Sequence, residues 1–206
     1  MSELRLTGSL SQFRLDYYAW SRDLAWPKKV GLALIMAGLT GLAAQVRIPL
    51  PHTPVPVTGQ VFAVLLSGVL LGGAWGGLSQ ALYVGLGAAG APWFSGWSGG
   101  VTLGPTAGYL MGFIPAAVLV GWVSDRFVRA RSFVPQVLLM AAGAATILVF
   151  GAAAFSLFTR ADFKTTFLMA VCPFIAVDSV KAIAAAAISS TLLPKPVGEA
   201  RASSRR

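Results

Sequence analysis

An acid and a base lie three residues apart inside one of the most apolar stretches of the chain. Residues 172–193 read CPFIAVDSVKAIAAAAISSTLL, and Asp178 and Lys181 are the charged residues in that stretch. The three-residue spacing places both side chains on one face of a helix. Three interpretations are open: a structural ion pair, a proton relay in a transporter, or the polar end of a ligand pocket. We favour the pocket, because ionisable side chains inside a membrane usually face a cavity or a partner.

The composition indicates that this stretch lies in a membrane. Hydrophobic residues make up 56% of the 206 residues, charged residues only 11%, and the mean hydropathy is +0.73. An average soluble domain has about 25% charged residues. Six hydrophobic segments cover about residues 29–46, 58–71, 74–90, 106–123, 135–158 and 167–193. We therefore predict an all-α integral membrane protein with six transmembrane helices, the second of them too short to span upright.

The chain divides into three regions. These are an N-terminal extension at 1–27, a six-helix transmembrane domain at 28–193 and a basic tail at 194–206. In the extension, Phe13, Tyr17, Trp20 and Leu24 recur at helical spacing. That pattern fits a helix that lies on the membrane surface, and a flexible leader is the alternative. We expect Pro27 to end the segment, because proline interrupts helices.

The distribution of basic residues predicts how the chain is oriented. The net charge is +9, and Lys and Arg gather at the ends and in loops, which indicates membrane orientation rather than nucleic-acid binding. With six spans, one side holds Arg5, Arg14, Arg22, Lys28, Lys29, Arg126, Arg129, Arg131, Lys195, Arg201, Arg205 and Arg206. The other side holds only Arg47, Arg160 and Lys164. Because cytoplasmic loops carry the excess of basic residues, we predict that both termini are cytoplasmic.

Two kinds of functional site are missing from the sequence. No G-x-x-x-x-G-K-[ST] motif occurs, so we do not expect the chain to hydrolyse ATP through a P-loop. His52 and Cys172 are the one histidine and the one cysteine, which are too few for a His/Cys metal site. We therefore predict that the chain is not an enzyme and holds no metal.

Two loop-like stretches indicate a pocket near the ion pair. RIPLPHTPVPVTGQ at 47–60 is rich in proline, which favours a stiff, extended connection. GAPWFSGWSGGVTLGPTAGYLMGF at 90–113 mixes aromatic residues, hydroxyl groups and glycines, a combination that can enclose a small, partly apolar ligand. For Trp93 and Trp97, an aromatic belt at the membrane interface is the alternative. Both stretches fall on the extracytoplasmic side, so we expect the pocket to open outward.

Four motifs occur together in one order along the chain. They are PVPVTGQ at 54–60, LGAAGAPWFSGWSGG at 86–100, LGPTAGYLMGF at 103–113 and DSVKA at 178–182. Between about residues 28 and 193 the sequence thereby resembles the BioY family, the biotin-binding, substrate-specific subunits of energy-coupling factor transporters. The resemblance implies a six-helix subunit in the bacterial cytoplasmic membrane that takes up biotin. Its implied partners are a transmembrane coupling protein and two ATP-binding-cassette ATPases, and no cofactor is implied.

The same resemblance implies which residues bind the ligand. Asp178 and Lys181 correspond to the acid and the lysine with which family members bind biotin. Ser95 stands in the loop where the family often has asparagine. An arginine that some members carry near this loop has no counterpart, since no Lys or Arg occurs between Arg47 and Arg126. The remaining expected contacts are Val57, Thr58, Gln60, Tyr83, Phe94 and Tyr109.

Small residues form a stripe on the first predicted helix. Ala33, Ala37 and Gly41 are spaced by four and share a helix face on which another backbone can approach closely. From the spacing alone, packing inside the subunit is the default. The resemblance instead implies that this stripe docks the coupling protein.

Two rival functions remain open at this point. One is a stand-alone proton-coupled carrier of a small acid or amide, in which the Asp178–Lys181 pair would relay a proton. The other is a membrane anchor that binds no ligand.

Overall fold

The structure is a computed structural model in which residues 2–101 and 104–194 are described. The helices are α1 (Ser2–Asp23), α2 (Trp26–Gln45), α3 (Gln60–Leu71), α4 (Gly73–Ala88), α5 (Ala107–Arg126), the short 3₁₀ helix η1 (Val128–Arg131), α6 (Phe133–Thr159), α7 (Phe163–Ala170) and α8 (Cys172–Leu192). Two short strands, β1 (Arg47–Ile48) and β2 (Val57–Thr58), pair antiparallel. All of the predicted basic tail except Pro194 lies outside the described residues.

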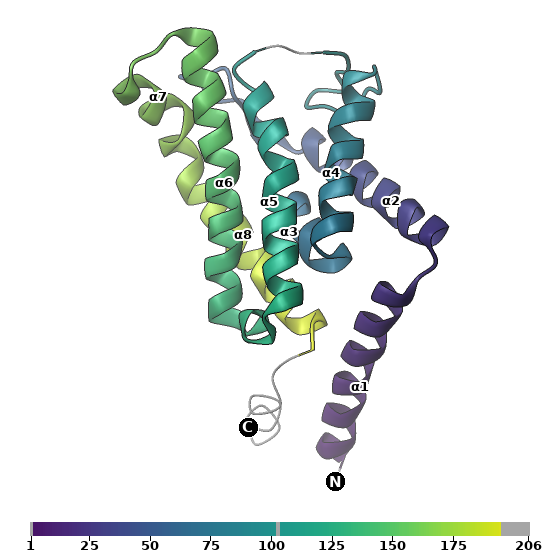
Figure 1. The fold of residues 1–206 in the computed structure, drawn as a ribbon. Helices are drawn as coiled ribbons and strands as arrows, with labels where there is room; N and C mark the ends of the chain where they lie inside the picture. The colour runs from purple at the N-terminus through teal and green to yellow at the C-terminus, as the bar shows by residue number, and fades with distance from the viewer. Residues whose placement is uncertain (1, 102–103, 195–206) are drawn as a thin grey trace.

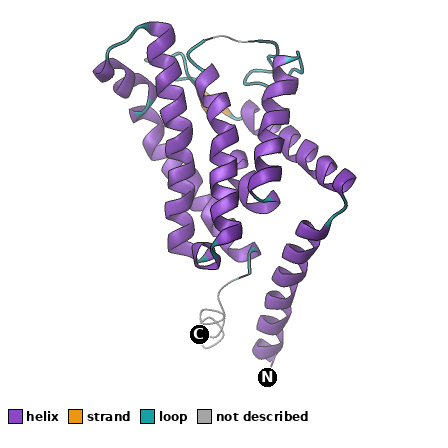
Figure 2. Cartoon of the chain, in the orientation of Figure 1, coloured by secondary structure: helices purple, strands orange, loops and turns teal. Residues whose placement is uncertain are grey.

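The helices α3, α4, α5, α6 and α8 run side by side as a bundle, and α2 crosses it obliquely (Figure 1). Within the described residues, α2, α5, α6 and α8 are long and apolar enough to cross a membrane, whereas α3 has only 12 residues. The strands form a small patch among the loops at one end of the bundle (Figure 2). The predicted all-α membrane fold is confirmed, including the short second segment.

The turn between α3 and α4 and the contact with α5 depend on glycine. Gly72 alone separates α3 from α4, and its φ of +84° lies in a region that favours glycine. A Cβ at Gly68 would lie 2.4 Å from the carbonyl oxygen of Ala117, and one at Gly121 would lie 2.4 Å from that of Gly68. The backbones of α3 and α5 are therefore in contact, as small residues allow in membrane helices. This contact fixes α3 against the centre of the bundle.

The last predicted segment, 167–193, is not one helix. It is broken at Val171, where α7 ends and α8 begins with Pro173 in its first turn. Proline is tolerated there because a first-turn N–H has no partner within the helix. At its other end, α7 is capped by Asp162, whose carboxylate accepts a hydrogen bond from the Thr165 N–H at 3.2 Å. Hydrogen bonds from Thr165 hold the pKa of this carboxyl below its ordinary value.

The extension forms the helix α1, which confirms the helical spacing of its aromatic residues. Pro27 does not end α1 as expected but lies in the first turn of α2. In Figure 1, α1 reaches beyond the end of the bundle at which α8 ends. The Arg14 side chain donates a hydrogen bond to the carbonyl oxygen of Thr191 at 2.7 Å, so α1 is joined to the last turn of α8.

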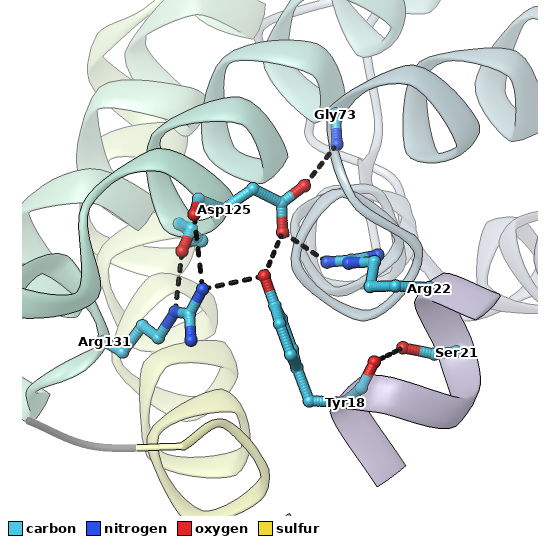
Figure 3. A network of polar contacts seen from close by, with 7 residues as sticks. Tyr18, Ser21, Arg22, Gly73, Asp125 and Arg131 are labelled. Atoms are coloured by element: carbon cyan, nitrogen blue, oxygen red, sulfur yellow. Dashed lines mark hydrogen bonds and ion pairs between the residues drawn. The ribbon is translucent and has the colours of Figure 1, made fainter. Parts of the chain in front are cut away.

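A polar network anchors the second half of α1 to the bundle (Figure 3). Asp125, at the end of α5, forms an ion pair with Arg22 and accepts from the Tyr18 hydroxyl at 3.3 Å and from the Gly73 N–H at 3.4 Å. Arg131 donates to the Tyr18 hydroxyl at 2.8 Å and lies over the Tyr18 ring, 4.4 Å from its centre. One carboxylate thus ties α1 to the α3–α4 turn and to the end of α5.

Candidate ligand-binding site

A cavity of about 370 Å³ lies at the end of the bundle opposite α1, under the loops that follow α2 and α4. The paired strands close one side of it, with Arg47 opposite Thr58 and Ile48 opposite Val57. Its lining residues come from β1, β2, both loops, α3, α5, α6 and α8. They are Arg47, Pro49, Leu50, Thr53, Pro54, Val55, Pro56, Thr58, Gln60, Val61, Phe94, Ser95, Ser98, Thr106, Tyr109, Leu110, Phe113, Ile147, Phe174, Asp178 and Lys181.

The ion pair of α8 belongs to the wall of this cavity. Lys181 Nζ lies 2.8 Å from Asp178 Oδ1, and the two side chains are 15% and 5% exposed. The predicted shared helix face is confirmed, because both residues line the cavity. The pair therefore presents a hydrogen-bond acceptor and a donor to anything that enters.

A chain of hydrogen bonds positions the polar side chains of α3 and β2. The Thr58 hydroxyl donates to Gln60 Oε1 at 2.7 Å, and Gln60 Nε2 donates to the Tyr83 hydroxyl at 2.7 Å. The Tyr83 hydroxyl in turn donates to the carbonyl oxygen of Trp93 at 3.3 Å. Thr58 and Gln60 line the cavity, whereas Tyr83 is fully buried behind them. Tyr83 thus supports the wall and does not form its surface.

Aromatic rings supply the apolar part of the wall. The rings of Tyr109 and Phe174 lie 5.7 Å apart, and Phe94 faces the cavity from the loop after α4. The Tyr109 hydroxyl donates to the carbonyl oxygen of Ala170 at 2.6 Å. Because that hydroxyl is already engaged, Tyr109 offers its ring to a ligand.

Ser95 lines the cavity with an unused polar atom. Its Oγ is shielded from solvent and has no hydrogen-bond partner among the described residues. A buried polar atom without a partner is uncommon and usually has a functional explanation. Ser95 is therefore available to a ligand.

Seven of the nine expected ligand contacts are brought together: Thr58, Gln60, Phe94, Ser95, Tyr109, Asp178 and Lys181. Val57 and Tyr83 are not lining residues. Val57 precedes Thr58 in β2, and successive side chains of a strand point to opposite faces, so Val57 turns into the core at 6% exposure. The lining also includes residues that the sequence did not single out as ligand contacts. Among these are Thr106, Phe174 and Arg47, and Arg47 is a cation at the rim.

The small-residue stripe of α2 does not face outward. Ala33 and Ala37 are 0% exposed, and a Cβ at Gly41 would lie 2.9 Å from the Trp93 Cβ. Helix α2 packs against α3 and α4. The chain's own helices and the loop after α4 therefore cover this stripe, as the default of packing inside the subunit predicts.

Comparisons with known proteins identify the family of the chain. The sequence model of the BioY family matches residues 16–195. The chain belongs to the BioY family. The family match begins within α1, earlier than the motifs alone indicate.

Relatives in the BioY family and one solved structure extend this match. A probable biotin transporter BioY of Methanothermobacter thermautotrophicus is 45% identical over 144 residues, covering 65% of this chain and 92% of that one. The biotin transporter BioY of Thermotoga maritima is 36% identical over 160 residues, covering 77% and 91%. The crystal structure of an S-component for biotin from an ECF-type ABC transporter matches with a TM-score of 0.74 at 22% identity, covering 82% and 94%. The fold is thus that of an S-component.

Proposed function

We propose that this chain binds biotin and is the substrate-specific subunit of an energy-coupling factor transporter. The observation that carries the proposal is the Asp178–Lys181 pair, which lies in the wall of a cavity otherwise lined mainly by apolar and hydroxyl side chains. Ligand pockets typically combine an apolar lining with a few polar groups that fix orientation. Family membership and the names of the relatives support the same ligand.

The chemistry of biotin matches this wall. Its ureido ring has two N–H donors and one carbonyl acceptor, and its sulfur ring and aliphatic tail are apolar. Asp178 accepts from a ureido N–H, and the free hydroxyl of Ser95 supplies a further hydrogen bond. The rings of Phe94, Tyr109 and Phe174 enclose the apolar part. A cavity of about 370 Å³ lies in the size range usual for small-molecule sites.

We further propose that a transmembrane coupling protein and two ATP-binding-cassette ATPases complete the transporter. The sequence has no P-loop, so ATP hydrolysis falls to partner chains. On α2 the outward face replaces the buried stripe as the docking surface. Ile35 and Leu42 are each 59% exposed, and Gly31 and Gly38 of the same face have no neighbouring atom within 4 Å of an added Cβ. This face allows the close backbone approach that membrane helices use to associate.

A binding assay tests the proposed ligand. The detergent-solubilised chain, without partners or nucleotide, should bind radiolabelled biotin saturably, and unlabelled biotin should displace it. Desthiobiotin, which keeps the ureido ring, should compete, and valeric acid should not. Absence of saturable binding by a monodisperse preparation would refute the proposal. Uptake of biotin into liposomes that contain only this chain, driven by an imposed proton gradient, would support the rival carrier instead.

A further inference from the structure

We propose that Arg47 binds the carboxylate of the ligand at the rim of the cavity, an assignment that rests on the proposed function. Arg47 is the first residue of β1, is exposed, and lines the same cavity as Asp178. The site should therefore prefer ligands that combine a ureido ring with an anionic tail. It should bind neutral esters or amides of the same compounds more weakly.

The charges of the lining residues do not cancel. Asp178 is the one acid among them, and Arg47 and Lys181 are the bases, so the wall carries one net positive charge. Lys181 is already paired with Asp178 at 2.8 Å. Within 12–101 and 104–194 no ion pair or hydrogen bond of the Arg47 side chain is found. The uncompensated charge of the site is therefore that of Arg47, and one ligand carboxylate neutralises it.

Two segments that line the cavity, strand β2 and the loop after α4, hold Arg47 in place. The pairing of Arg47 with Thr58 holds its backbone in the β1–β2 ladder. Its guanidinium reaches the loop after α4, where a Cβ at Gly96 would lie 2.6 Å from Nη1. Gly96 has a φ of +78°, a conformation that favours glycine. Glycine at this position thus leaves room for the guanidinium beside Phe94 and Ser95.

The difference in burial between Asp178 and Arg47 predicts how the ligand is oriented in the cavity. Asp178 is 4% exposed, in the wall formed by α8, whereas Arg47 is exposed at the mouth. A ureido ring placed against Asp178 points its valerate tail outward, towards Arg47. Lys181 is then left to donate to the ureido oxygen, so the two cations bind different groups of the ligand.

A guanidinium is suited to this role. It is always charged and presents parallel N–H groups that match both oxygens of a carboxylate. Because Arg47 is exposed, solvent and salt weaken the attraction, and we expect a moderate contribution to affinity. A neutral ligand has no carboxylate to pair with Arg47, so its affinity should not depend on this arginine or on salt.

The test combines two ligands with two variants. Wild type should prefer biotin to biotin methyl ester by about tenfold, or about 1.4 kcal/mol, and Arg47→Gln should abolish that preference by weakening biotin alone. Lys181→Met should weaken both ligands alike. Arg160→Gln removes an arginine that directly follows α6 and does not line the cavity, and it should change the affinity for neither ligand. Raising salt should weaken biotin binding to wild type and leave the ester unaffected.

The possible outcomes separate this assignment from the proposed function. A wild type that binds neither ligand refutes the proposed function itself. A wild type that binds biotin, with the preference kept in Arg47→Gln, overturns only the role of Arg47. Equal weakening of both ligands by Arg47→Gln also overturns it, because the residue then acts on the fold of the hairpin. The salt dependence of the unmodified chain keeps the test decisive if Arg47→Gln does not fold.

Discussion

Asp178 Oδ1 and Lys181 Nζ lie 2.8 Å apart in the wall of a cavity, one helical turn from each other on α8. Each charge is compensated by the other, so the pair is tolerated inside an apolar helix. The same contact means that neither residue is altered without affecting its partner.

The first prediction concerns this pair. Asp178→Asn and Lys181→Met should each weaken biotin binding by at least about tenfold, because a ligand contact is lost and the remaining partner is left buried and unpaired. The double variant removes both charges together. If the pair binds ligand, the double variant should remain at least as weak as either single variant in the radiolabel assay. Near-normal affinity of a well-folded double variant would show that the pair is structural only.

The second prediction tests whether Tyr83, which is buried behind the cavity wall, positions the lining residue Gln60. Tyr83→Phe removes the acceptor for Gln60 and the donor to Trp93 without changing any lining ring. It should weaken biotin binding about fivefold, or about 1 kcal/mol, which is the usual net contribution of one hydrogen bond, here the bond that positions the lining residue Gln60. Tyr109→Phe is the matched control, since its hydroxyl bonds Ala170 and not another lining side chain. That control should lower thermal stability yet leave affinity close to wild type, and the reverse ranking would contradict the positioning role of Tyr83.

The third prediction compares neighbouring positions on α2. Ala37 is 0% exposed, so Ala37→Trp should overpack the interface with α3 and α4 and destabilise the chain by about 1–3 kcal/mol. Gly38 faces open space, so Gly38→Trp should leave the fold and biotin binding intact. In a complete transporter, Gly38→Trp should nevertheless block ATP-driven uptake by separating α2 from the coupling protein. Normal uptake would exclude this face as the docking surface.

The fourth prediction concerns the anchor of α1. Asp125→Asn removes the charge that pairs with Arg22 and weakens the acceptor for Tyr18. Trypsin should then cleave after Arg14 or Arg22 several-fold faster, because α1 detaches more often from the bundle. Asp23→Asn is the control, since Asp23 is exposed on the same helix. Biotin affinity should stay unchanged, and a large loss would mean that the network acts on the distant cavity.

The fifth prediction concerns orientation. A reporter fused after Arg206 should behave as cytoplasmic, as the distribution of Lys and Arg predicts. A cysteine at position 164, in a Cys172→Ser background, should react with a membrane-impermeant thiol reagent added outside intact cells. Labelling only after the cells are broken would reverse the assigned topology.

The sequence predicted the ion pair because two charges in an apolar helix are conspicuous. Arg47 lies in the proline-rich stretch that indicates a pocket, but nothing in the sequence marks it as a ligand contact, since a cation beside a helix end also fits membrane orientation. Its place in the cavity depends on its pairing with Thr58, a contact that no periodicity marks. The break at Val171 was missed because apolar residues continue across it, and Pro173 fits the first turn of a new helix as readily as a loop.

The small residues of α2 show a different limit of prediction from sequence. A four-residue spacing identifies a face that permits close approach but does not say which neighbour approaches. Ala33 and Ala37 contact this chain's own helices, and Gly38, one position along, faces outward. Only the placement of α3 and α4 distinguishes these faces.

The β1–β2 ladder pairs just two residues of each strand, Arg47 with Thr58 and Ile48 with Val57. So short a ladder opens locally at a small fraction of the free energy needed to unfold the helices. The amide hydrogens of this hairpin should therefore exchange with deuterated solvent quickly in the empty protein. An occupied cavity, contacted from both the hairpin and α8, should slow that exchange. The time a ligand stays bound would then be set by how often four residues separate, while the helices beneath them stay still.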